Sequence, residues 1–255
     1  MNYILDFPLL VFALSFVAIW LSEWIGAFLR ERRGSLEEAE REDFNLIAAG
    51  TLTLLGLIIG FTFSMAISRY DQRKTYEEAE ANAIGTEFVR AGLLPATDTA
   101  SVRALLRNYL DQRILFYVTR DGGRLRQIDA ATARLETDLW SAVQAPAVAQ
   151  PTPVVALAVS GMNDVLNSQG YTQAAWWNRI PGSAWVLMAT IAICSNLLVG
   201  YGVRRAKARA TLLLVLPVVV SISFFLISDI DSPRGGIIRV RPQNLESLSQ
   251  SLFSR

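Results

Sequence analysis

Four long apolar stretches constrain this chain more than any other feature of its sequence. Each is close to the ~20 residues that an α-helix needs to cross the ~30 Å hydrocarbon core of a bilayer. Because backbone amides in lipid must find hydrogen-bond partners within their own segment, we expect helices rather than isolated strands. The stretches are residues 4–29, 44–67, 183–203 and 210–227. The sequence therefore predicts an integral membrane protein.

The stretches are arranged two and two around a polar middle, which predicts two helical hairpins with an inserted domain. In that middle, apolar residues follow helical spacing, and no alternating strand pattern of useful length is present. The expected fold class is an all-α membrane protein with four transmembrane helices and a helical domain between the second and third spans. The expected parts are a first hairpin (1–67), a helical extramembrane domain (68–182), a second hairpin (183–230) and a C-terminal tail (231–255).

Two features of the inserted domain can be predicted in more detail. Residues 68–94 should continue the second span as an unbroken helix that ends at Pro95, while Pro146, Pro151 and Pro153 should mark a linker. A later helix carries apolar residues at the three–four spacing that buries a seam against another helix. This stripe consists of Leu125, Ile128, Leu135, Leu139 and Ala142.

Composition excludes several classes of chemistry. The chain has no histidine, and its one cysteine, Cys194, lies within an apolar stretch, so zinc, haem and iron–sulfur sites lack their usual ligands. The same absence removes His-based nucleophilic catalysis, and no nucleotide-binding glycine loop is found. We therefore expect no catalytic residues, metal or cofactor. A net charge of +1 gives no reason to expect a nucleic-acid partner.

The short links between the spans predict the topology. Residues 30–43 and 204–209 each contain four Lys or Arg residues, and short cation-rich loops stay in the cytoplasm. This places both termini and the central domain outside, in the periplasm if the protein lies in a bacterial inner membrane. Cations that flank the second and fourth spans on their other side oppose this assignment: Arg69, Arg73, Lys74, Arg234, Arg239 and Arg241.

The second span carries small residues at every fourth position, which places them on one helix face. One interpretation is close packing against another helix. The other is that the face lines a pore, with large apolar residues forming a constriction. The candidate pore-lining residues are Thr53, Gly56, Ile59, Gly60, Phe63, Ser64 and Ile67.

Two other groups of charged residues lie at or inside the spans. Glu23, between Trp20 and Trp24, is either a functional intramembrane acid or an interfacial residue in an aromatic belt. A junction motif at the end of the fourth span contains Asp229, Asp231, Arg234 and Arg239. We expect it to form an ion-paired turn that holds the tail against the bundle, with Asp231 and Arg234 as partners; the alternative is that the motif belongs to the conduction path. Gly235 and Gly236 should let the backbone fold back with positive φ.

Several motifs resemble the bacterial membrane family called bestrophin-like. They are FTFS (61–64), SRYDQR (68–73), EAEANAIGT (78–86) and DIDSPRGGIIRV (229–240). The resemblance implies four spans with a helical insert and a distant relation to bestrophin anion channels, which are pentamers with a pore lined by the second span. The bestrophins' calcium clasp has no matched residues here. Bestrophins keep their insert in the cytoplasm, contrary to the charge-based topology.

Two functions follow from these features. The first is a homo-oligomeric ion channel, for anions by the resemblance, that passes small inorganic ions through a pore lined by the second span. The alternative is a non-conducting scaffold or signalling protein that binds a partner through the apolar stripe at residues 125–142, because such a stripe pairs equally well with another chain.

Overall fold

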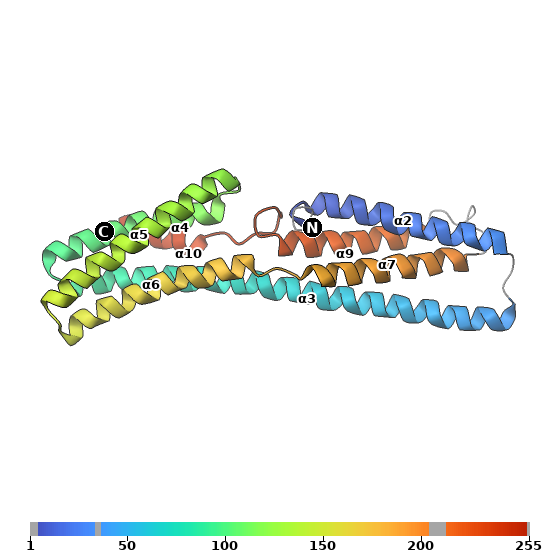
Figure 1. Cartoon of the computed structure of the whole chain (residues 1–255), viewed down its shortest axis with the longest axis horizontal. Helices are drawn as coiled ribbons and strands as arrows, with labels where there is room; N and C mark the ends of the chain where they lie inside the picture. The colour runs from blue at the N-terminus through green and yellow to red at the C-terminus, as the bar shows by residue number, and fades with distance from the viewer. Residues whose placement is uncertain (1–4, 34–36, 204–212, 254–255) are drawn as a thin grey trace. The chain divides into compact units, whose positions relative to one another are not determined.

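The computed structural model describes residues 5–33, 37–203 and 213–253. Every regular element in these residues is helical, which confirms the all-α prediction (Figure 1). The elements are α2 (Pro8–Arg33), α3 (Glu38–Arg90), η1 (Ala91–Leu93), α4 (Ala96–Val118), α5 (Gly122–Ala149), α6 (Pro153–Trp177), α7 (Gly182–Gly202), α9 (Val215–Asp231) and α10 (Gln243–Phe253).

The helices divide into two compact units. Unit 1 comprises Met1–Arg69 and Arg179–Arg239, and unit 2 comprises Tyr70–Asn178 and Val240–Arg255. Helix α3 contributes its first part to unit 1 and its second part to unit 2, so the second apolar stretch continues as helix beyond Ile67, as the sequence predicts.

Unit 1 contains the apolar helices, and α2 packs against both α7 and α9 in it. Two glycines allow the backbones of α2 and α7 to approach closely. A Cβ atom at Gly200 would overlap the backbone of Glu23, and one at Gly26 would overlap the backbone of Leu197. Close backbone contact at small residues is the usual way that membrane helices associate.

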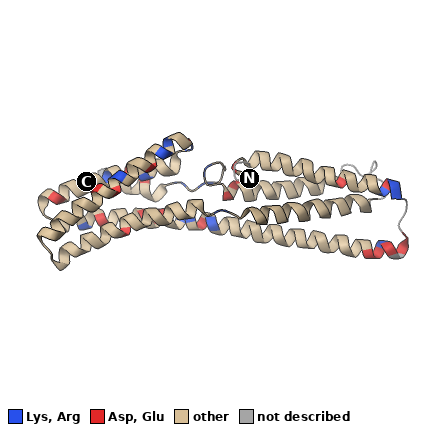
Figure 2. Ribbon diagram, in the orientation of Figure 1, with Lys and Arg blue, Asp and Glu red and all other residues tan. Residues whose placement is uncertain are grey.

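Three helical stretches in the described residues are long and apolar enough to cross a membrane: Pro8–Arg33, Glu40–Leu93 and Pro153–Gly202, of which the last comprises α6 and α7. Figure 2 shows few charges along α2, α7, α9 and the first part of α3, apart from the basic end of α2 and the acidic start of α3. The stretch predicted as the fourth span begins outside the described residues, and its described part lies in α9, an apolar helix of 17 residues. The cationic link 204–209 lies outside the described residues as well.

Unit 2 is a helical bundle in which α5 packs against α4 and α6. The apolar stripe of α5 is used inside this bundle: Ile128 and Leu139 are buried, and Leu125, Leu135 and Ala142 pack against the same core. The stripe on which the scaffold alternative rests is therefore already covered by the chain's own helices.

The predicted linker is shorter than expected, because Pro146 lies inside α5 rather than beyond its end. The last turn continues past it, and the N–H of Gln150 donates to the carbonyl of Pro146 at 2.9 Å. The connection is residues 150–152, after which Thr152 caps α6 by accepting a hydrogen bond from the N–H of Val155 at 3.2 Å. Pro153 occupies the first turn, where its missing N–H costs no helical hydrogen bond.

Candidate functional sites along helix α3 and at the junction

The membrane stretch of α3 has a narrow buried side. Leu55, Thr62 and Ala66 are buried, and their spacing of seven and four residues places them on one helical stripe. The hydroxyl of Thr62 donates to the carbonyl of Ile58 at 2.8 Å, so its polarity is satisfied within the helix. This stripe is the side of the span that packs within the chain.

The predicted pore-lining residues lie on a different face of the same stretch. Ile59, at its edge, is half-buried, and the other six residues are exposed: Thr53, Gly56, Gly60, Phe63, Ser64 and Ile67. A Cβ atom at Gly56 or Gly60 would meet no atom of the described chain within 4 Å. Close packing between helices of the described chain is therefore not the reason why glycine occupies these two positions.

Large apolar side chains cover much of the remaining surface of this stretch. Leu54, Leu57, Phe61 and Met65 are exposed, with Phe61 63% accessible. In a bilayer such side chains contact lipid tails or another copy of the chain, because the hydrocarbon core contains no water.

Glu23 lies inside the packing of unit 1, whereas Trp20 and Trp24 are exposed. Neither carboxylate oxygen has a hydrogen-bond partner among the described residues. A carboxylate in such a place is costly and is a functional candidate by default. The structure thus separates Glu23 from the two tryptophans, which face outward as residues of an aromatic belt do.

The junction motif connects distant segments of unit 1. The carboxylate of Asp231 accepts the N–H of Ile180 at 3.1 Å and binds Arg179 at 3.3 Å, and Arg179 also pairs with Asp6. This carboxylate therefore fastens the end of α9 to the segment that leads into α7. The sequence suggested Arg234 as the ion-pair partner of Asp231. It gave no sign of Arg179, which is far away in the chain.

The other acid of the motif shapes the loop after α9. Asp229 is buried and accepts the backbone N–H groups of Ile237 and Ile238 at 2.7 and 2.8 Å, while Arg234 and Arg239 lie half-buried in the same segment. Two backbone amides on one carboxylate hold the loop folded back on the helix end.

The expected positive φ at Gly235 and Gly236 is wrong, since neither residue adopts it. These glycines are required for space instead. A Cβ atom at Gly235 would overlap the carbonyl oxygen of Asp6, and one at Gly236 would overlap that of Asp229.

Sequence reasoning missed a row of charges in the second part of α3. Arg73, Glu77, Glu80 and Glu87 are each at most 1% exposed, and Ile84 and Ala91 continue the same row. The row has the three–four spacing of a buried helical seam. This spacing is the one feature of the sequence that could have indicated that these charged residues are buried. Glutamates are rarely buried, so a composition-based analysis assigns them to the surface.

Glu80 is the centre of the largest polar cluster in this row. It forms a salt bridge with Arg113 of α4, and it accepts hydrogen bonds from Tyr117 at 3.2 Å and Thr172 of α6 at 3.1 Å. Burial and the nearby carboxylate both raise the pKa of Tyr117. Burial favours a lower pKa for Arg113, but the Glu80 carboxylate outweighs it and the pKa is raised. The guanidinium of Arg113 therefore stays protonated.

Glu77 holds the C-terminal helix. Its carboxylate accepts the backbone N–H groups of Asn244 and Leu245 at 2.9 and 3.1 Å, and the side-chain amide of Asn244 at 2.6 Å. These N–H groups belong to the first turn of α10, where no carbonyl of the helix can accept them. One α3 carboxylate thus caps a helix that lies far away in the sequence.

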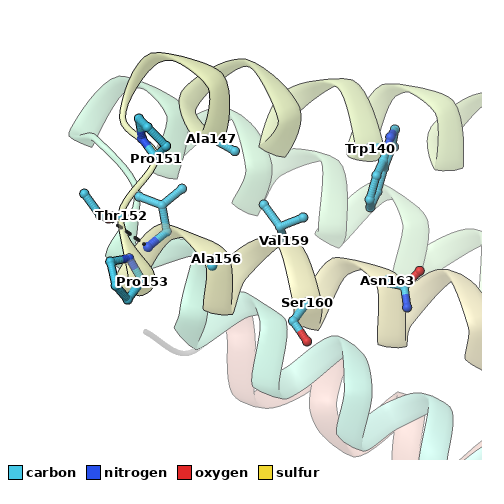
Figure 3. Close-up of a pocket in the computed structure, with 10 residues that line it drawn as sticks. Trp140, Ala147, Pro151, Thr152, Pro153, Ala156, Val159, Ser160 and Asn163 are labelled. Carbon is cyan, nitrogen blue, oxygen red and sulfur yellow. Dashed lines mark hydrogen bonds between the residues drawn. The ribbon is translucent and has the colours of Figure 1, made fainter.

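A cavity of about 760 Å³ opens between α5 and α6 (Figure 3). Trp140 lines one end, and Pro151 and Pro153 line the other. Its polar side chains are Thr152, Ser160 and Asn163, so the lining carries no ionised group. The cavity therefore combines an apolar wall with three neutral polar side chains.

The all-helical fold and its long apolar helices define an integral membrane protein. The chain belongs to the bestrophin-like family, because the model of the Bestrophin-like domain matches residues 10–245. This confirms the resemblance that the sequence motifs indicate.

Solved structures share the fold at low sequence identity. A bacterial Bestrophin homolog from Klebsiella pneumoniae superposes with a TM-score of 0.65 at 14% identity, over 95% of this chain and 97% of that chain. A mutant of this homolog gives 0.64 at 12% identity, with 95% and 98% covered. Another structure, described as a membrane protein, gives 0.65 at 14% identity, with 95% and 97% covered. No curated protein sequence matched the chain.

Proposed function

We propose that this protein is the subunit of an oligomeric ion channel whose pore is lined by the membrane stretch of α3. The observation that carries the proposal is the exposed face with Gly56, Gly60 and Phe63, which no described helix of the chain covers. The stretch from residue 44 to residue 67 contains no charged residue. An uncharged face of small residues interrupted by large apolar ones fits a constriction that gates by dewetting.

One helix face cannot enclose a pore, so the proposal requires several copies. The exposed Leu57, Phe61 and Met65 supply apolar surface for contact between copies. A closed ring is the usual solution when one patch contacts a different patch on the next copy. By analogy with bestrophins we propose a pentamer.

We propose anions as the permeant ions, on family membership and on the absence of carboxylates along the span. Rings of acidic side chains are a common device of cation channels. Ile59, Phe63 and Ile67 instead place apolar side chains at successive turns of the proposed pore. We also propose that each subunit has four spans.

Purified protein in planar bilayers tests the channel. We expect unitary currents whose reversal potential follows the chloride gradient, and Phe63→Ala should raise the conductance several-fold by widening the constriction. Val17→Ala is the matched control, since Val17 is an exposed apolar residue of α2, and it should leave the conductance unchanged. Silent bilayers from well-folded oligomer, or equal effects of both variants, would contradict the proposal.

We propose, from the cation-rich links, that the extramembrane helices face the periplasm of the bacterial inner membrane. Cysteines placed at the exposed Gly122 and Glu31 in a Cys194→Ala background should react oppositely with an impermeant thiol reagent on intact cells. We expect labelling at Gly122 and protection at Glu31. The reverse pattern would put the domain in the cytoplasm, as in bestrophins.

A further inference from the structure

A small polar cavity lies between α3 and α6 in unit 2. Its volume is about 300 Å³. The residues that line it are Asn82, Ala83, Thr86 and Arg90 of α3, and Gly161 and Asp164 of α6. None of these residues belongs to the proposed pore face or to the junction motif.

A fully buried carboxylate adjoins this cavity. Glu87 is 0% exposed, and neither of its carboxylate oxygens has a hydrogen-bond partner among the described residues. Its side chain reaches the backbone of Gly161, where a Cβ atom would overlap Oε2 of Glu87 and lie 2.8 Å from Nη1 of Arg90. The glycine therefore makes room for both charged groups at the wall of the cavity.

Arg90 lies between two acids. Its Nη1 atom is 3.9 Å from Oδ2 of Asp164, at the outer limit of an ion pair, and both side chains are partly exposed. The same Nη1 atom is the one beside Gly161 and the Glu87 side chain. One guanidinium thus has a loose partner in solvent and an unpaired carboxylate within reach.

The charges around Glu87 are few. Arg90 acts on it from its own helix and Asp164 from α6. On α4, Arg103 donates to the carbonyl of Phe88 at 3.1 Å, and both Arg103 and Arg107 lie over the Phe88 ring. Arg103 is thus held at the residue next to Glu87, and Arg107 also donates to the carbonyl of Leu252 in α10 at 3.1 Å.

We propose that Arg90 is shared between Glu87 and Asp164, and that the protonation of Glu87 decides which carboxylate holds it. With Glu87 neutral, Arg90 stays with Asp164 at the cavity mouth. With Glu87 ionised, the buried negative charge draws Arg90 inward and releases Asp164. The contact between α3 and α6 is then a proton-sensitive switch.

The electrostatics of the cavity place the switch near neutral pH. The pKa of Glu87 is raised to about 8. Burial is the largest cause, Arg90 acts to lower the pKa and Asp164 acts to raise it. The ordinary value is 4.5, so folding takes up a proton between about pH 4.5 and about pH 8. Stability from this group is fully present below pH 4.5 and is lost as the pH rises through about 8.

Difference infrared spectroscopy of the full chain in detergent tests the proposal directly. Other buried carboxyls such as Glu23 give bands of their own, so the signal is the component that the parent has and Glu87→Gln lacks. This component should disappear as the pH rises through about 8. Asp164→Asn should move its midpoint down and Arg90→Gln should move it up, because the two partners act on Glu87 with opposite sign. Glu78→Gln, at an exposed position of the same helix, is the control and should leave the band unchanged.

Three results would overturn the proposal: no carboxyl component that Glu87→Gln lacks, a midpoint of that component near pH 4.5, or a midpoint that neither partner variant moves. Thermal unfolding guards against a variant that merely folds poorly. The unfolding temperature of the parent should fall from pH 5 to pH 8.5 relative to that of Glu87→Gln. Parallel curves for the two proteins would contradict proton uptake at this residue.

Discussion

Helix α3 follows different packing rules in its two parts. In the membrane part, the buried stripe of Leu55, Thr62 and Ala66 is uncharged, and the exposed side is apolar. In the part within unit 2, the buried row contains charged residues such as Glu77 and Glu80, and exposed positions such as Glu78 are charged as well. A buried charge is acceptable where neighbouring helices supply hydrogen bonds, as Arg113 and α10 do.

The comparison shows where each part gets its specificity. Around the membrane part, α2 and α7 match their backbones closely through Gly26 and Gly200, because lipid gives no hydrophobic drive between helices. The part in unit 2 selects partners through two carboxylates, since Glu77 binds α10 and Glu80 binds α4 and α6. Buried polar groups of this kind fix one arrangement, provided that each is satisfied.

The largest expected effect comes from breaking the buried pair in unit 2. Arg113→Ala leaves the Glu80 carboxylate buried without its cation, and we expect a loss of about 3–5 kcal/mol in the free energy of unfolding. Denaturant titration in detergent, followed by the circular dichroism of the helices, measures it. The double variant Glu80→Leu with Arg113→Met should lose less free energy of unfolding than the sum of the losses of Glu80→Leu alone and Arg113→Met alone. Additive losses would mean that the two residues act independently.

A comparison of one glycine from α7 with one from α3 tests the packing of the apolar helices in unit 1. Gly200→Ala forces a methyl group against the backbone of Glu23, and we expect it to cost about 1–3 kcal/mol through overpacking. Gly60→Ala meets open space in the single chain and should not lower the thermal stability of monomers in detergent, because alanine favours helix by up to about 1 kcal/mol. Equal destabilisation by both variants would contradict the assignment of an inner and an outer glycine face.

The junction motif gives the smallest expected effect. Asp231→Ala removes the acceptor of the Ile180 N–H group and one partner of Arg179, which is partly exposed, so we expect a loss of about 1–2 kcal/mol. Thermal unfolding in detergent measures it, and a double variant with Arg179→Ala should cost less than the sum of the singles. If Asp231→Ala folds as stably as the parent yet conducts differently, the motif acts in ion passage rather than in structure.

The sequence predicted the parts of this molecule that depend on local periodicity. Apolar length predicted the membrane helices, and fourfold spacing placed Gly56, Gly60 and Ser64 on one face. Continuity of α3 beyond Ile67 followed from a composition rich in Glu, Ala and Arg, with no glycine or proline between residues 61 and 84.

Contacts between distant segments were beyond sequence reasoning. Arg179 lies 52 residues before Asp231, so nothing in the local pattern marks it as a partner. Glu77 and Glu80 have the spacing of a core seam, but a glutamate is expected at an exposed position. Their burial can be predicted only when the partner groups on α10 and α4 are known. Gly235 and Gly236 were identified as special for a wrong reason, because close approach to Asp6 and Asp229 is a tertiary property.

Single-particle imaging of the purified protein tests the central proposal most directly. The pore proposal predicts a closed ring of subunits around an axial opening, with the face that contains Gly60 and Phe63 turned toward the axis and Leu55 turned away from it. A monomer, or an oligomer in which this face of α3 contacts lipid, would contradict it.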